Sequence, residues 1–167
     1  ACWISSPSLE NVTITGNSAS IRGGGIFCWS NSSPSLENVT ISGNSAGNGG
    51  GIYNDNSSPS LLNVMIKNND GSGVVCTNSS SPTLTNVTIS GNTDNDYGGG
   101  IIFWSNSSAN LVNCILWNDS QPEIDGSGSV TAIYSDIQGG YTGTGNIDSD
   151  PLFVDAENGD YRLSNYS

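Results

Sequence analysis

The side chains of this chain that could take part in chemistry are mostly carboxylates and thiols. The sequence has 15 acidic residues, three basic residues and no histidine, for a net charge of −12. Carboxylates in flexible loops are ligands that Ca²⁺ prefers, and the best-spaced candidates are Asp148, Asp150 and Asp155. Solvated turn residues are the alternative interpretation of these aspartates, and we favour it. Calcium is the only cofactor for which the sequence offers candidate ligands.

The four cysteines form the second reactive set. Cys2, Cys28 and Cys76 fall at one position of a sequence repeat, and Cys114 falls at another. If Cys2 and Cys28 stand on neighbouring turns of the chain, their separation suits a disulfide. Two buried thiols fit the same spacing equally well. The cysteines do not have the spacing of zinc ligands.

The charge balance excludes two classes of partner. A nucleic-acid-binding protein needs clustered Lys and Arg, but the chain has only Arg22, Lys67 and Arg162. The same shortage argues against binding to an anionic membrane, and no apolar run approaches the roughly 18 residues of a membrane-spanning helix. We therefore expect no nucleic-acid partner and no membrane insertion. Abundant Asn, Ser, Thr and Gly with little Lys favours an extracellular or cell-surface location.

These carboxylates and thiols are positioned by a sequence repeat that runs along the chain. "SSPSLENVTISGNSAGNGGGI" recurs with variations, and its copies align on Pro7, Pro34, Pro59 and Pro82, with Ala109 in the same slot. The intervals of 27, 25, 23 and 27 residues are typical of a solenoid. Apolar residues alternate within each copy with the two-residue period of a strand. The pattern predicts an all-β parallel β-helix with coils of about 25 residues and three short strands per coil.

Three apolar columns would form its core, one like side chain above another. They are Leu9, Leu36, Leu61, Leu84 and Leu111; Val12, Val39, Val64, Val87 and Cys114; and Ile14, Ile41, Ile66, Ile89 and Leu116. Burying one such side chain contributes roughly 1.5–3 kcal/mol before entropy is subtracted. Five stacked coils therefore provide a core without any long helix.

Asparagines recur at two further positions and predict hydrogen-bonded ladders, because Asn tolerates left-handed backbone and caps turns, and stacked amides bond along a column. The first ladder is Asn11, Asn38, Asn63, Asn86 and Asn113, and the second column is Asn17, Asn44, Asn69, Asn92 and Asp119. Asn11, Asn38 and Asn86 also match the glycosylation pattern, but we favour the ladder there because a bend needs them. The Asn-Ser-Ser loops are candidate glycosylation sites in a host that glycosylates, at Asn31, Asn56, Asn78 and Asn106.

The strand after each glycine-rich corner suggests a contact surface. It begins with two adjacent apolar residues in four copies, as in Ile26-Phe27 and Ile52-Tyr53. Side chains alternate across a strand, so one apolar column must face outward, and such a stripe normally marks an interaction surface. The candidate stripe is Phe27, Trp29, Tyr53, Val75, Ile102 and Trp104. The segment from Tyr141 onward, a neighbouring copy or partner protein, or a sugar ring could cover it.

Three stretches, "SPSLENVTISGNSA", "GGGIY" and "GTGNIDSDPLFVDAENGDYRL", resemble right-handed parallel β-helix repeat proteins of the pectate-lyase-like superfamily, of the polymorphic outer-membrane protein repeat type. The resemblance covers nearly the whole chain and implies a single domain over 1–167, with regular repeats over 1–128 and an irregular terminal coil and tail over 129–167. Both ends fall inside the repeat pattern, so we expect a fragment or a processed subunit.

The superfamily contains lyases, hydrolases, adhesins and structural proteins, so the resemblance leaves function open. Its lyases use a basic side chain with calcium or other cations, and its hydrolases use paired carboxylates on adjacent strands. The repeat register places no such pair here, and we expect a non-catalytic chain. Unpaired strand edges at the coil ends favour association. We therefore expect an extracellular structural or adhesive protein that self-associates into a filament or surface array or binds another surface protein. The alternative is a carbohydrate-binding or polysaccharide-cleaving module of a larger surface protein, with a glycan as its partner.

Overall fold

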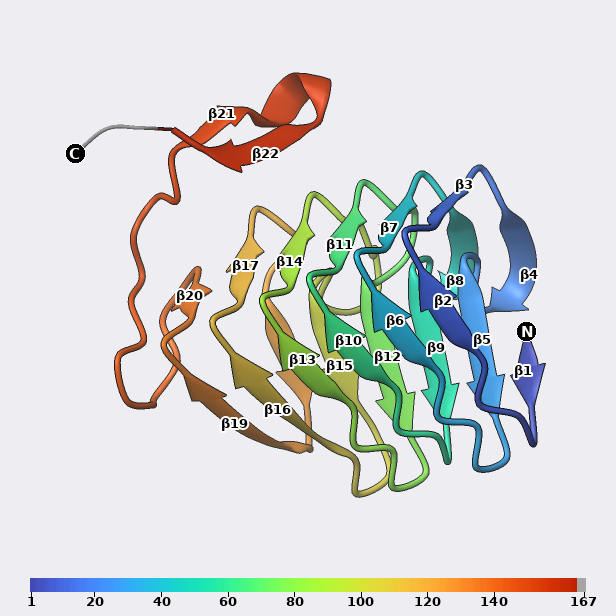
Figure 1. Ribbon diagram of the computed structural model, residues 1–167. Helices are drawn as coiled ribbons and strands as arrows, with labels where there is room; N and C mark the ends of the chain where they lie inside the picture. The colour runs from blue at the N-terminus through green and yellow to red at the C-terminus, as the bar shows by residue number, and fades with distance from the viewer. Residues whose placement is uncertain (165–167) are drawn as a thin grey trace.

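The computed structural model describes residues 1–164 and shows stacked coils that form three parallel sheets (Figure 1). Sheet A contains β1 (Cys2–Trp3), β5 (Ile26–Trp29), β9 (Ile52–Asp55), β12 (Val74–Thr77), β15 (Ile101–Phe103) and β18 (Ile124–Gly126). Sheet B contains β2 (Ser8–Glu10), β6 (Ser35–Glu37), β10 (Ser60–Leu62), β13 (Thr83–Thr85), β16 (Ser108–Val112) and β19 (Ser129–Ile133). Sheet C contains β3 (Thr13–Thr15), β7 (Thr40–Ser42), β11 (Met65–Lys67), β14 (Thr88–Ser90), β17 (Ile115–Trp117) and β20 (Asp136–Ile137). The predicted three-stranded coil is confirmed.

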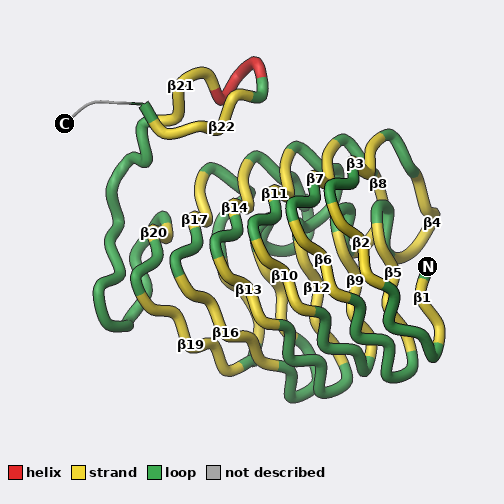
Figure 2. Tube along the Cα trace, in the orientation of Figure 1, coloured by secondary structure: helices red, strands yellow, loops and turns green. Residues whose placement is uncertain are grey.

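Five further elements lie outside these sheets. β4 (Ser18–Arg22) and β8 (Ser45–Asn48) form a two-stranded parallel sheet beside the first two coils. β21 (Phe153–Asp155), the short 3-10 helix η1 (Ala156–Asn158) and β22 (Asp160–Leu163) form a terminal hairpin. Figure 2 shows short loops joining one strand to the next around each coil. No helix among the described residues is long and apolar enough to cross a membrane.

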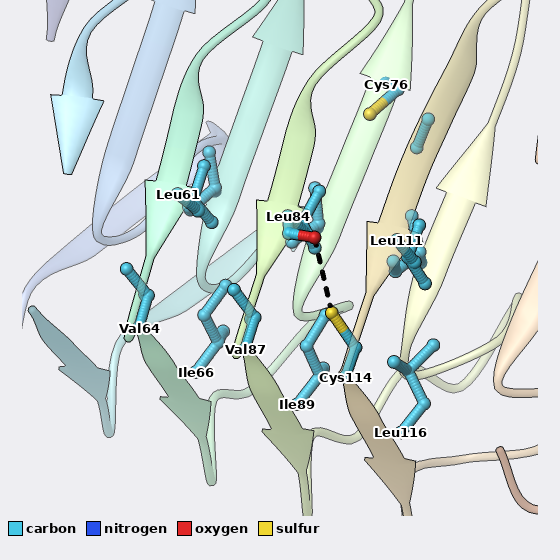
Figure 3. Close-up of a cluster of buried hydrophobic side chains, with 14 of the residues drawn as sticks. Leu61, Val64, Ile66, Cys76, Leu84, Val87, Ile89, Leu111, Cys114 and Leu116 are labelled. Atoms are coloured by element: carbon cyan, nitrogen blue, oxygen red, sulfur yellow. Dashed lines mark hydrogen bonds between the residues drawn. The ribbon is translucent and has the colours of Figure 1, made fainter. Parts of the chain in front are cut away.

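The register of the sheets follows the sequence repeat residue by residue. Leu36 pairs with Leu9 on one side and with Leu61 on the other, and the column continues through Leu84 to Leu111. The isoleucine column is aligned in the same way in sheet C. The predicted columns therefore stack, and Figure 3 shows their side chains together in the interior.

Glycine allows the corner before sheet A to pack closely. A Cβ atom built on Gly24 would lie 2.6 Å from the carbonyl oxygen of Gly50 in the next coil. Gly49 adopts a φ of +63°, which is favourable only for residues that tolerate left-handed backbone. The recurring glycines are therefore required by the stacking of consecutive corners, in agreement with the corner interpretation of the glycine triplets.

The backbone pairing of sheets B and C continues beyond residue 128. β19 pairs with β16 and β20 pairs with β17, so the first nine residues of the segment expected to be irregular, 129–137, extend sheets B and C. The chain then leaves the repeat and forms a loop against the last coil before it reaches the terminal hairpin (Figure 1). The last coil thus retains the backbone pairing of its predecessors although its side chains depart from the repeat.

Candidate interaction surface

The outward column of sheet A exists, but most of it is covered. Phe27, Tyr53, Val75 and Ile102 are in register and form an apolar cluster with Trp104, separate from the interior core. The exposed fractions of Tyr53, Val75 and Ile102 are only 3%, 0% and 0%. The central part of the expected stripe is therefore packed within the chain itself and does not form an open surface.

Two residues outside sheet A cover parts of this column, one at the end of β4 and one in the connection before β15. The Arg22 guanidinium lies over the Tyr53 ring, 5.2 Å from its centroid. Tyr97, in the connection before β15, packs edge-on against Trp104 at 5.3 Å. The C-terminal segment does not cover this sheet, because it contacts sheet C instead: Lys67 Nζ donates to the Gly159 carbonyl oxygen at 2.5 Å.

The N-terminal end of the solenoid exposes apolar surface, as do Tyr134 and Ile147 beside the last coil and Leu152, Val154 and Leu163 in the tail. Leu9, Val12 and Ile14 are only partly buried, whereas their equivalents in the next coil are 0–2% exposed. Trp3 and Ile4 are 65% and 71% exposed. The backbone edges of β1, β2 and β3 have sheet partners on one side only. This end combines a partly open core with unpaired strand edges.

Trp29 and Ile21 extend this exposed apolar surface beyond Trp3 and Ile4. Trp3 stacks on Trp29 with centroids 6.0 Å apart and an angle of 19°, and Trp29 is itself 47% exposed. Ile21, 64% exposed, lines a shallow groove with Arg22 and Phe27. We call the set Trp3, Ile4, Ile21 and Trp29 the N-terminal patch.

The C-terminal end of the solenoid is closed by the loop over residues 138–149. Tyr134 donates its backbone N–H to Thr144 at 2.8 Å, and the Asn146 amide nitrogen donates to the Ala132 carbonyl at 3.0 Å. Ile147 donates to Ser135 at 2.9 Å, and Tyr141 packs against the core. The last coil therefore has hydrogen-bonding partners and an apolar cover, which the first coil does not have.

The first asparagine ladder lies on the surface. The amide nitrogens of Asn63, Asn86 and Asn113 donate to the amide oxygens of the preceding members at 3.2, 3.1 and 2.8 Å. Asn11 instead contacts Glu10 at 3.4 Å. All five residues have φ between +53° and +54°, so the predicted left-handed bend is present in every coil.

The second asparagine column is a buried ladder with more bonds per residue. Asn69 Oδ1 accepts from the Asn44 backbone N–H at 2.9 Å and from the Asn44 amide at 3.0 Å. Its own amide donates to Asn92 Oδ1 at 2.8 Å and to the Ile41 carbonyl at 3.2 Å. Asp119 ends this ladder and accepts twice from Asn92. The predicted ladder is confirmed.

A serine ladder is a feature that the sequence analysis missed. Ser32, Ser57, Ser80 and Ser107 are 0–2% exposed. The backbone N–H of each of the first three donates to the hydroxyl of the next, at 3.0–3.2 Å. The recurring Ser-Ser before each proline was the available signal, but serine in a loop is usually solvated and gives no indication of burial.

The cysteine column is interior. Cys2 pairs in register with Cys28, and Asn54 and Cys76 continue the column. All four cysteines are free thiols in this structure, with Cys28, Cys76 and Cys114 buried and Cys2 partly exposed, and a disulfide between Cys2 and Cys28 stays a prediction. Burial raises the pKa of the Cys28 and Cys76 thiols to about 12 each. Asn54 is 0% exposed, and its amide donates to Cys76 Sγ at 3.8 Å.

The candidate calcium ligands do not converge. Asp148 accepts from the Gly139 N–H at 3.2 Å, Asp150 accepts from the Leu152 N–H at 2.9 Å, and Asp155 caps η1 by accepting from the Asn158 N–H. Within residues 1–164, no group of three or more Asp, Glu, Cys or His side chains is arranged to hold a metal ion. Each aspartate has the geometry of a turn residue.

The candidate glycosylation sites lie in the turn between sheets A and B. Asn31, Asn56, Asn78 and Asn106 are all exposed and have φ between +49° and +61°. Asn78 donates its amide to Asp55 at 2.7 Å. Their exposure permits access by a modifying enzyme, and modification itself stays a prediction.

These features define a parallel β-solenoid with one open and one closed end. Residues 2–116 match the family model described as right handed beta helix region, and the chain belongs to this family. No curated protein and no solved structure gives a significant match to the chain. Membership of this family establishes the fold and does not specify a function. The resemblance to the polymorphic outer-membrane protein repeat type stays a prediction.

Proposed function

We propose that this chain is a non-catalytic structural or adhesive β-helix of the cell exterior, which associates with a second copy through its N-terminal patch. The observation that carries the proposal is the exposure of the N-terminal patch, in which Ile21 and Trp29 are 64% and 47% exposed and Trp3 stacks on Trp29 with ring centroids 6.0 Å apart. Contiguous exposed apolar surface of this kind normally serves association. The composition, poor in Lys and rich in Asn, Ser and Thr, supports the exterior location.

The cover over the last coil favours a closed pair of copies over a head-to-tail filament. A head-to-tail filament requires each end to bind the other kind of end. The loop over 138–149 already occupies the C-terminal end, where Asn146 and Ile147 take up backbone groups of the last coil. An isologous contact uses the same surface on both copies, and the N-terminal end offers such a surface.

The mass of the particle in solution tests this proposal. We expect the wild-type chain to elute as a dimer in size-exclusion chromatography with light scattering, and the double variant I4S/I21S to elute as a monomer. The matched control is V154S/L163S, which changes two side chains of 51% and 56% exposure on the terminal hairpin and should leave the dimer intact. A wild-type chain that is monomeric at high concentration would refute the proposal.

A second candidate function is glycan binding at the paired tryptophans. The exposed, nearly parallel rings of Trp3 and Trp29 offer an apolar face to a sugar ring. Asp55 is aligned with Trp29 in the next coil, and its carboxylate can accept hydrogen bonds from a sugar. Binding to a glycan array, lost in W29A and retained in W104A, would support this function. Absence of binding to neutral and acidic glycans, with and without calcium, would leave the structural role alone.

A further inference from the structure

A buried pair of carboxyl groups lies at the end of the asparagine ladder. Asp119 follows β17 and Glu123 precedes β18, and their exposed fractions are 6% and 2%. The Asp119 backbone N–H donates to Glu123 Oε1 at 3.2 Å, and the two carboxyl groups are within hydrogen-bonding reach of each other. Asp119 Oδ2 and Glu123 Oε2 are both buried without a hydrogen-bonding partner in this structure.

The ladder dictates which oxygen is free. In the preceding coils, Asn44, Asn69 and Asn92 each accept through Oδ1 and donate through Nδ2. Asp119 keeps the accepting half, because its Oδ1 receives the Asn92 backbone N–H at 2.6 Å and the Asn92 amide at 2.8 Å. An ionised carboxylate has no hydrogen to donate. A proton on Oδ2 would restore the donor that asparagine supplies at this position.

Two adjacent carboxylates cannot both be ionised in a dry site without a large cost. We infer that Asp119 and Glu123 form a proton-binding site, in which Asp119 carries the proton on Oδ2 and donates it to the Glu123 carboxylate. The proton stabilises the junction of β17 and β18, and with it the closed end of the solenoid. This inference is independent of the proposed association through the opposite end.

The charges around the pair agree with this assignment. Burial raises the pKa of the Asp119 carboxyl well above its usual value, and Glu123 raises it further. Burial also raises the pKa of Glu123, although its hydrogen bonds with Asp119 lower it. The other titratable or charged groups on neighbouring segments are Asp94, Asp96 and Tyr97 before β15, Asp125 in β18, Asp136 in β20, and Asp150, Asp155, Glu157, Asp160, Tyr161 and Arg162 in the tail, part of which lines a pocket with Trp117 and Asn118. The one cation among these described residues, Arg162, is paired with Asp160 at 2.6 Å.

The sign of the pH dependence follows from the raised pKa. The unfolded carboxyls lose their protons near pH 4, whereas the folded pair retains one at higher pH. The stabilisation is therefore fully present below about pH 4 and is lost as the pH rises through the folded-state pKa. Because the chain has no histidine, few other groups titrate between pH 5 and pH 8. Burial also raises the pKa of Asp136. The variant D119N, described below, distinguishes the contribution of the Asp119–Glu123 pair to the pH dependence from that of Asp136.

Thermal unfolding at pH 5 and pH 8 tests the inference. We expect the wild-type Tm to fall by about 3 °C or more between these values. D119N places the ladder's own residue at this position and should remove most of the fall, with a higher Tm than wild type at pH 8. D96N changes the same charge at an exposed site and should keep the wild-type dependence.

Two results would overturn the inference. One is an equal fall of Tm in wild type and D119N, because the titrating group would then lie elsewhere. The other is a rise of the wild-type Tm at pH 8 on addition of CaCl₂ that D119N does not show, because the pair would then hold a cation and not a proton. Carboxyl ¹³C shifts of Asp119 and Glu123 across the same range would give a direct reading of the proton in the folded state.

Discussion

The buried ladder offers the sharpest test of what holds the coils together, through the substitution N69A. Asn69 makes four side-chain hydrogen bonds, two from Asn44, one to Asn92 and one to the Ile41 carbonyl, at 2.8–3.2 Å. Its removal leaves the buried Asn44 backbone N–H without its acceptor. An unsatisfied buried group costs about 1–3 kcal/mol, and each further lost bond about 0.5–1.5 kcal/mol. With one unsatisfied group and three further lost bonds, we therefore expect a loss of about 2.5–7.5 kcal/mol, a large share of the 5–15 kcal/mol typical of folded proteins.

The matched control for N69A is N63G in the surface ladder. Asn63 also bonds along its column, to Asn38 at 3.2 Å and from Asn86 at 3.1 Å, but water can replace both partners. Glycine keeps the left-handed φ of +53°, so N63G should cost about 1 kcal/mol or less. Urea unfolding followed by circular dichroism measures both free energies. Equal losses in the two variants would refute the view that the buried amides stabilise the stack more than the exposed ones do.

Three further predictions follow from other contacts. I89A, at a fully buried position, should lower the free energy of unfolding by about 2–5 kcal/mol and I89V by about 0.5–1.5 kcal/mol, and urea titration would detect any departure from this order. Cys76, whose pKa burial raises to about 12, should resist iodoacetamide at pH 8 while the partly exposed Cys2 reacts. Peptide mass spectrometry measures both reactions, and equal labelling of the two thiols would mean that the column is open. K67M removes the contacts of Lys67 with Gly159 and Tyr161 and should speed trypsin cleavage after Arg162 several-fold, whereas the control R22M should not. Equal cleavage rates in K67M and the wild-type chain would mean that Lys67 does not hold the hairpin.

Features that repeat along the sequence could be predicted, because each copy supplies independent evidence for the same position. Leu61 and Ile66 were assigned to the core by their recurrence, and the register places both in direct alignment with their equivalents. Asn69 was assigned to a ladder on the same basis. Recurrence also exposed the glycine corners. A period conveys which residues share an environment, and the strand alternation then distinguishes the inward side from the outward side.

Burial of the outward column could not be predicted in this way. Val75 and Ile102 belong to an apolar cluster separate from the interior core, and their exposed fraction of 0% could not be read from the repeat pattern. Tyr97 and Arg22 each occur in one coil only, and their positions against Trp104 and Tyr53 follow from loop conformation. A sequence pattern identifies the face of a strand, whereas the cover of that face depends on contacts between distant segments.

The same reasoning explains why the acid pair escaped the sequence analysis. A repeat register predicts pairs of carboxylates only in equivalent positions of neighbouring strands, whereas Asp119 and Glu123 lie four residues apart in one irregular connection. Asp119 stood out only as the one member of its column that is not asparagine. The departure falls at the last rung, where the next coil supplies no amide and Glu123 approaches instead. A repeat protein can therefore place its ionisable chemistry where the repeat stops, because there a ladder position loses its usual partner and must acquire a different one.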